Sequence, residues 1–332
     1  GLFKDPDLPD DPGGIPRDAP SAYHHRPELR ELYRTWRAIL DSYPAGEFPG
    51  ARTAVGEVWY DALGTLRPYL LPGGLPQVFN FELILSRWQA GALRAAIDGV
   101  LSLAGGSRAP WVLGNHDVPR PASRYRLDEG FTPDMAARLV ALGQRGAEVG
   151  ARRARAAALL LLALPGSAYI YQGEELGLPE VTDIPDDARR DPQFARSAGR
   201  RPGRDGCRVP LPWARGGPGF GFSAAPPWLP QPDGWGDYSV EAQSGDPGSF
   251  LSLYREALRL RREHPALGAG GLRWIDQPGR PAALCFAREP GFVFAANLGG
   301  APVPLPPHRQ VLLASGPARG ALPPDTAAWL SA

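Results

Sequence analysis

The sequence has 332 residues, of which 43% are hydrophobic, and a formal net charge of +1. Its length suits one large barrel with a small appended domain, and its near-zero charge excludes a general electrostatic attraction to nucleic acid or to a charged membrane surface. No apolar run is long enough to span a bilayer, and the two cysteines, Cys207 and Cys285, lie far apart, as in a reduced protein. We therefore expect a cytoplasmic protein with no nucleic-acid or membrane partner.

The first half of the chain alternates between short apolar runs and helical patterns. Residues 1–27 are rich in Pro and Asp and predict a surface loop, and Pro27–Leu40 has apolar residues at helical spacing, with proline in its first turn. Helical residues also cover 88–103 and 133–164. Between these helices, apolar runs predict four strands: Thr53–Tyr60, Gln77–Leu85, Trp111–Asp117 and Ser167–Tyr171. This alternation is typical of parallel strands joined by crossover helices.

Polar side chains stand at the end of each predicted strand. In chain order they are Glu57, Asn80, Asn115–Asp117 and Gln172–Glu175. In barrels of parallel strands the chemistry takes place at the carboxyl ends of the strands, because the loops there surround a common mouth. Four strands with polar ends therefore indicate one site built from several loops.

Simpler interpretations of single residues remain open. His116 and Asp117 could cap the turn after their strand. Glu57 stands inside an apolar run, where a buried carboxyl would have a raised pKa that suits a general acid, whereas a glutamate on the outer face of an edge strand would point to solvent. Glu174 and Glu175 are predicted to cap a helix.

The second half of the chain is less regular. Leu176–Asp246 is a long irregular segment rich in Gly, Pro, Arg and Trp, and a loop of that length is usually functional or disordered. Ser249–Arg262 predicts an amphipathic helix with Ser249 as its cap. Short β-like runs then follow between Gly and Pro residues and predict a small antiparallel domain: Leu284–Ala287, Phe292–Asn297 and Gln310–Ala314.

Six stretches in this order resemble the α-amylase superfamily (glycoside hydrolase family 13), most closely its α-glucosidase and oligo-1,6-glucosidase branch. They are Val55–Val58, Phe79–Glu82, Gly114–Asp117, Tyr171–Glu175, Gly203–Trp213 and Leu253–Arg255. The resemblance implies an α/β fold in which residues 1–267 form the second half of a catalytic (β/α)8 TIM barrel, about strands 5–8 with their helices. The loop 176–246 would join strand 8 to helix 8, and residues 268–332 would form a β-sandwich-like domain.

The resemblance also implies roles for four residues. Glu57 matches the general acid/base of the family, and Asp117 matches the carboxylate that holds sugar hydroxyls and supports the transition state. His116 matches a histidine that hydrogen-bonds the terminal sugar, and Arg204 resembles an arginine that reaches the same subsite. Tyr171 and Trp59 could stack on a sugar or pack in the core.

The family's nucleophilic aspartate is not found in these residues. Gly1–Pro6 (Gly-Leu-Phe-Lys-Asp-Pro) resembles the continuation of the motif that carries it. We therefore expect that the chain starts shortly after the nucleophile. The family's calcium-binding loop would also lie in the missing part, so no metal site and no cofactor are expected here.

The activity that the resemblance implies is retaining hydrolysis of terminal α-linked glucose from short oligosaccharides or disaccharides, with a small oligosaccharide as the binding partner. The 332 residues alone are expected to be inactive. Two alternatives remain open: a glucosyltransferase or sucrose isomerase of the same superfamily, and a non-catalytic barrel that binds sugar. The preference between α-1,4 and α-1,6 linkages and the oligomeric state do not follow from these motifs.

Overall fold

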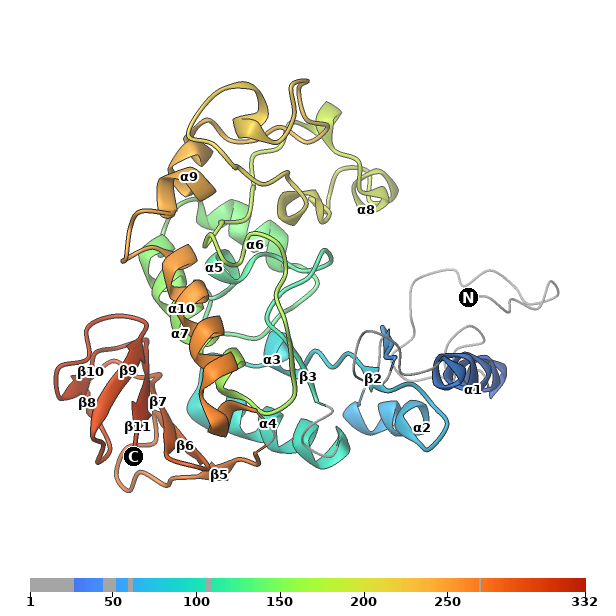
Figure 1. Ribbon diagram of the computed structural model, residues 1–332. Coiled ribbons are helices and arrows are strands. Elements are labelled where there is room, and N and C mark those ends of the chain that lie inside the picture. The colour runs from blue at the N-terminus through green and yellow to red at the C-terminus, as the bar shows by residue number, and fades with distance from the viewer. Residues whose placement is uncertain (1–26, 44–51, 59–61, 105–108, 269) are drawn as a thin grey trace. The chain divides into compact units, whose positions relative to one another are not determined.

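The computed structural model describes residues 27–43, 52–58, 62–104, 109–268 and 270–332 (Figure 1). The chain divides into two compact units, one of residues 1–80 and 99–110 and the other of residues 81–98 and 111–332. Residues 1–26 of the loop predicted over 1–27 lie outside the described residues. No helix in the described ranges is both long enough and apolar enough to cross a membrane.

The first unit contains the helix predicted from Pro27, followed by a small parallel sheet. Helix α1 covers Pro27–Ser42, which confirms that prediction, and a 3-10 turn (Leu63–Leu66) and α2 (Arg67–Leu70) separate β1 (Val55–Gly56) from β2 (Gln77–Val78). The two strands pair in parallel, with Val55 opposite Gln77 and Gly56 opposite Val78. Their buried core consists of Leu66, Tyr69, Leu75 and Val78.

The strands predicted over Thr53–Tyr60 and Gln77–Leu85 are much shorter in the structure. Within the described residues the first reduces to Val55–Gly56, and the second becomes β2 followed by the helical turn α3 (Glu82–Leu85). The ladder extends only as far as the Ala54 carbonyl, which accepts from the Gln77 amide, and the Gly56 carbonyl, which accepts from the Phe79 amide. An apolar run predicts burial, but the length of a strand depends on how much backbone a neighbour presents for pairing.

The second unit contains two further strands, β3 and β4, and the helices that connect them. Helix α4 (Ala90–Ala104) is divided between the two units, and β3 (Pro110–Val112) pairs with β4 (Ser167–Tyr169). Three helices connect these strands: α5 (Pro121–Arg124), α6 (Met135–Leu142) and α7 (Ala147–Ala163). The indole of Trp111 is fully buried, and its Nε1 donates to the Pro165 carbonyl at 2.7 Å, which fixes β3 beside the entry to β4.

The long segment after β4 is irregular but has its own core. Leu176, Val209, Leu211, Leu229 and Trp235 belong to one buried cluster. The segment contains only short helical pieces: Asp186–Ala188, α8 (Pro192–Arg196), Asp205–Cys207, Pro218–Gly221, Asp233–Tyr238 and α9 (Val240–Gln243). Its many prolines and glycines prevent long elements, and the buried cluster gives it order.

The C-terminal part is a helix followed by an antiparallel sheet (Figure 1). Helix α10 (Phe250–Glu263) confirms the predicted helix, and the Ser249 hydroxyl accepts from the Ser252 amide as its cap. A short 3-10 turn, Pro265–Leu267, follows it. One sheet has the order β5-β6-β7-β11-β9, and β8 pairs with β10. The strands are β5 (Arg273–Trp274), β6 (Ala283–Arg288), β7 (Phe292–Asn297), β8 (Val303–Pro304), β9 (Gln310–Ala314), β10 (Ala321–Leu322) and β11 (Thr326–Ser331).

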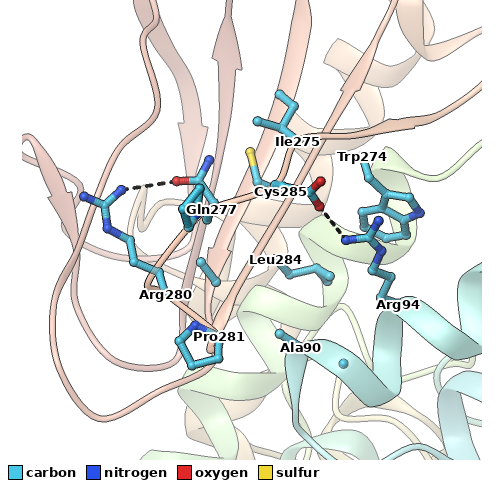
Figure 2. A pocket seen from close by; sticks show the side chains of 13 residues that line it. Ala90, Arg94, Trp274, Ile275, Gln277, Arg280, Pro281, Leu284 and Cys285 are labelled. Atoms are coloured by element: carbon cyan, nitrogen blue, oxygen red, sulfur yellow. Dashed lines mark hydrogen bonds and ion pairs between the residues drawn. The ribbon is translucent and has the colours of Figure 1, made fainter.

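The sheet packs against α7 through its inner strand β11. The fully buried Trp329 of β11 donates from Nε1 to the Leu159 carbonyl of α7 at 3.0 Å. At the edge of the sheet, a hollow of about 270 Å³ lies between the start of α4 and strands β5 and β6 (Figure 2). There the guanidinium of Arg94 lies 4.9 Å from the centre of the Trp274 ring and 2.8 Å from Asp276, so that a cation–π contact and an ion pair join α4 to the sheet.

Candidate functional site

The loop after β3 places Asn115, His116 and Asp117 in a tight turn. The Asn115 side chain accepts from the Asp117 amide at 2.8 Å, which is the local hydrogen bond that favours asparagine in turns. Asn115 therefore caps this turn, and the carboxylate of Asp117 takes part in other contacts.

The Asp117 carboxylate lies among three cationic or potentially cationic side chains. Its Oδ1 lies 2.7 Å from Nη1 of Arg204, 3.0 Å from Nη2 of Arg208 and 3.5 Å from Nε2 of His116. Arg208 also donates from Nε to the His116 carbonyl at 2.8 Å. The structure thus brings together three of the four predicted site residues, from segments almost 90 residues apart in the chain.

Asp191 holds Arg204 on its other side. Nε of Arg204 lies 2.7 Å from Oδ2 and Nη2 lies 3.0 Å from Oδ1, which is the two-pronged geometry that suits guanidinium and carboxylate groups. Burial raises the pKa of Asp191, but hydrogen bonds from Arg204 and from the amides of Gln193 and Arg204 outweigh it and lower the pKa to about 2. Asp191 is therefore a charged anchor, and it was not predicted from the sequence.

A second buried carboxylate fixes the loop that carries Asp191. Oδ2 of Asp205 accepts from the amides of Arg190 at 2.7 Å and of Asp191 at 2.9 Å. In the sequence, the only signal for Asp205 is its position directly after Arg204. The signal for Asp191 was the Asp-Pro pair at the start of α8, where the aspartate caps the helix by accepting from Gln193.

The end of β4 is attached to the same region by Arg120, another residue that the sequence did not single out. Its buried guanidinium donates to the Gln172 carbonyl and to the Cys207 carbonyl, each at 2.8 Å. The Tyr171 hydroxyl also donates to the Cys207 carbonyl, at 3.0 Å, and Arg120 lies 5.5 Å from the centre of the Tyr171 ring. These contacts favour packing over sugar stacking for Tyr171, whereas Trp59 lies outside the described residues.

Glu174 and Glu175 do not cap a helix, so that prediction was wrong. The chain after β4 forms successive turns, in which Glu174 accepts from the Tyr171 amide at 2.9 Å and Glu175 from the Gly173 amide at 2.8 Å. Glu174 is buried, its Oε1 has no hydrogen-bond partner, and burial raises its pKa to about 8. The two carboxylates accept hydrogen bonds from backbone amides of this turn. Acidic residues at the start of a helix give the same sequence pattern, which is why a helix cap was predicted.

Glu57 belongs to the other compact unit. It follows β1 directly and its side chain is exposed. The structure therefore agrees with the interpretation in which Glu57 faces solvent. Its carboxylate is not desolvated there.

Two further observations concern metal ligands and the cysteine of this region. The part of the chain that the structure describes contains no group of three or more His, Cys, Asp or Glu side chains that could hold a metal ion. The Cys207 thiol is buried, donates to the Arg204 carbonyl at 3.1 Å and has a raised pKa because of burial, so it lacks the thiolate character of a nucleophile.

Comparison with known proteins shows which protein families this chain resembles. A family model described as alpha amylase, catalytic domain, matches residues 2–270, and a model described as a domain of unknown function (DUF3459) matches residues 285–329. A probable alpha-glucosidase of Rhizobium meliloti is 32% identical over 308 residues, which cover 87% of this chain and 51% of that protein. An oligo-1,6-glucosidase of Parageobacillus thermoglucosidasius is 26% identical over 305 residues, covering 81% of this chain and 50% of that protein.

Solved structures agree with this assignment. The crystal structure of an alpha-glucosyl transfer enzyme has a TM-score of 0.72 and 29% sequence identity, covering 94% of this chain and 57% of the other. The chain spans about half the length of the curated relatives it matches. The expected fold, part of an α-amylase catalytic barrel followed by an antiparallel β domain, is confirmed. The family model matches more than half of the chain, which therefore belongs to the alpha-amylase family.

Proposed function

We propose that these residues supply the acid/base and the sugar-holding groups of a retaining α-glucosidase that removes terminal glucose from short α-linked oligosaccharides. The observation that carries the proposal is the Asp117 carboxylate at the end of β3, held by Arg204 and Arg208 beside His116. The names of the relatives, alpha-glucosidase and oligo-1,6-glucosidase, support this substrate class.

The proposed reaction gives each residue a separate task. Glu57 protonates the leaving oxygen while a second carboxylate attacks the anomeric carbon, and Glu57 then takes a proton from the water that releases the sugar. The contacts of Arg204, Arg208 and His116 all end on Oδ1 of Asp117. In the proposal, Oδ2 of Asp117 therefore accepts sugar hydroxyls, and His116 donates to the same ring.

Because Asp117 matches the sugar-holding carboxylate of the family, the proposal assigns the nucleophile to a different carboxylate. Asp191 is unsuitable, because both of its oxygens are engaged by Arg204 and its side chain is fully buried. The sequence contains no recognisable nucleophile motif, so the proposal requires a carboxylate from outside these 332 residues.

Hydrolysis of p-nitrophenyl α-glucoside tests the proposal. The protein as its gene encodes it should release nitrophenol, Glu57→Gln should reduce the steady-state rate of this release by about 10²–10⁴-fold because the attacking water then lacks its base, and the 332-residue chain alone should be inactive. Turnover that does not depend on Glu57 would contradict the proposed role of this residue. Turnover by the 332-residue chain would show that it holds a nucleophile of its own.

Glucosyl transfer is the second candidate, and the similarity to an alpha-glucosyl transfer enzyme favours it. Both reactions share the same residues and differ in whether water or a sugar hydroxyl accepts the glucosyl group. Chromatography of the products from maltose separates them, because hydrolysis yields only glucose, whereas transfer yields longer sugars. A sucrose isomerase would instead convert sucrose into an isomeric disaccharide, and a non-catalytic protein would bind sugar without turnover.

A further inference from the structure

A hollow of about 410 Å³ opens in the long segment after β4. Its lining consists of Arg190, Asp205, Arg208, Pro210, Trp228 and Leu229. This volume is within the range of about 300–1,000 Å³ that is usual for ligand pockets. Arg208 lines the hollow and also contacts the Asp117 carboxylate and the His116 carbonyl, so the hollow adjoins the proposed sugar site.

Trp228 is the most unusual part of this lining. The residue is 72% exposed, although the next residue, Leu229, is buried in the core of the segment. Prolines at 226, 227 and 230 restrict the backbone on both sides. Buried Leu229 and the restricted backbone thus hold the Trp228 side chain at the rim of the hollow. Exposure of this apolar ring to water does not stabilise the fold.

The polar lining is held by the same network as Asp117. The Arg190 amide is fixed by Asp205, and the exposed side chain, which lines the hollow, donates from Nη1 to the Asp187 carbonyl at 2.7 Å. Guanidinium groups donate several hydrogen bonds in a fixed plane, which suits hydroxyl oxygens. An aromatic face together with such donors is the chemistry that a pyranose ring requires, because the ring has an apolar C–H face and a hydroxyl-bearing edge.

We propose that this hollow binds the sugar on the leaving-group side of the bond that is cleaved, with Trp228 stacked on its ring and Arg190 donating to its hydroxyls. This inference rests on the proposed function. A terminal glucose at Asp117 leaves the next sugar outside that site, and Arg208 joins the site to the hollow.

Two substrates with the same glucosyl group test the inference. Maltose and isomaltose carry a second sugar, whereas α-glucosyl fluoride has a leaving group too small to occupy the hollow. In the protein as its gene encodes it, Trp228→Ala should lower kcat/KM for one or both disaccharides by about tenfold, as loss of roughly 60 Å² of apolar contact predicts. The value for the fluoride should stay within about twofold of the wild type.

Trp213→Ala is the matched control. Trp213 is a second exposed tryptophan of the same segment, 51% exposed, and does not line the hollow. It should leave the ratio of disaccharide to fluoride kcat/KM unchanged. Equal losses on all substrates, or no loss, in Trp228→Ala would overturn the inference while the proposed function stood.

Equilibrium binding decides the inference if the proposed function itself fails. A wild-type protein that hydrolyses neither the fluoride nor a disaccharide would disprove the proposed function. Isothermal calorimetry with maltose then compares the wild type with Trp228→Ala. Weaker binding by the variant, at least about fivefold, would support the site at Trp228, and equal binding, or no binding by either protein, would overturn it.

Discussion

At the scale of single residues, the position of Arg204 depends on Asp191. Arg204 reaches Asp117 with one nitrogen of its guanidinium group and uses two others to hold Asp191. The Asp191 side chain is inaccessible to solvent, whereas the Arg204 side chain retains 29% exposure. Asp191 therefore positions the arginine, and Arg204 in turn orients Asp117.

Asp191→Asn should destabilise the protein by about 2–3 kcal/mol, somewhat less than the cost of about 3–5 kcal/mol for breaking a fully buried pair. Urea denaturation measures the change. Asp186→Asn is the control, because the pair that Asp186 forms with Arg189 is exposed on the aspartate side and should contribute less than about 1 kcal/mol. Equal stabilities of the two variants would contradict an anchoring role.

The pH dependence gives a second measurement on Asp191. Its pKa falls from an ordinary 3.8 to about 2 on folding, so the folded state holds the charged form more strongly than the unfolded state. The stabilisation is present above about pH 3.8 and is lost as pH falls through about 2. Asp191→Asn should therefore lack this part of the acid-induced loss.

The pH dependence of stability expected from Glu174 is opposite to that expected from Asp191. Burial raises its pKa from 4.5 to about 8, so its folded-state stabilisation is full below about pH 4.5 and declines as pH rises through 8. Glu174→Gln does not titrate, and its free energy of unfolding should gain about 3–4 kcal/mol relative to the wild type between pH 5 and pH 8. Denaturation curves at both pH values measure this difference.

An exposed glutamate provides the control for Glu174. Glu148 lies in the first turn of α7 and is exposed, so Glu148→Gln should change stability by the same small amount at pH 5 and pH 8. Parallel pH profiles for the wild type and Glu174→Gln would show that the buried carboxyl does not titrate in this range.

The sequence predicted the residues around Asp117 better than it predicted those that hold them. His116, Asp117 and Arg204 were predicted to serve one site, and the structure places all three in contact around one oxygen. Arg120 was missed because its partners are backbone carbonyls 52 and 87 residues along the chain, and Asp191 was missed because its Asp-Pro pair signals a helix cap and not the contact with Arg204.

At the scale of elements, the turn after β4 depends on a glycine. Gly173 has a φ of +91°, and a Cβ on it would lie 2.4 Å from Nη1 of Arg120. Gly173→Ala should cost about 2–4 kcal/mol, because it combines backbone strain with displacement of a buried guanidinium. Thermal unfolding measures the loss as a lower Tm.

Gly279 separates the two contributions. It has a φ of +73° and no atom within 4 Å of its Cβ position, so Gly279→Ala should cost only the backbone strain of about 1 kcal/mol. If both variants lost the same stability, the contact with Arg120 would have no share in the cost.

Elements with a strong local pattern were predicted best. The helix that begins at Phe250 has apolar periodicity and a serine cap, and β7 occupies the predicted residues Phe292–Asn297. Strand β11 was missed, although it lies inside the sheet, because Thr-Ala-Ala-Trp-Leu-Ser has small residues where alternation would be expected. Its burial comes from pairing with β7 and β9 on both sides, which no local pattern records.

At the scale of the whole molecule, the proposed reaction uses residues of both compact units. Glu57 belongs to the first unit, and Asp117, His116 and Arg204 belong to the second. The resemblance of the ordered motifs to the family predicted this set, because the order of motifs along the chain does not depend on the strand lengths, which were predicted too long for β1 and β2. A test of the acid/base therefore tests the role proposed for Glu57.

The leaving group distinguishes an acid from a structural residue. Glu57→Gln removes the proton donor, so kcat for maltose, whose alkoxide leaving group needs protonation, should fall by about 10³-fold. Fluoride leaves without protonation, so the first step with α-glucosyl fluoride should be nearly unaffected and be seen as a burst of fluoride before slow deglycosylation. Rapid-quench measurement of fluoride checks this on the protein as its gene encodes it. A structural role for Glu57 predicts instead that the burst disappears together with maltose turnover, because a disordered site would bind and cleave neither substrate.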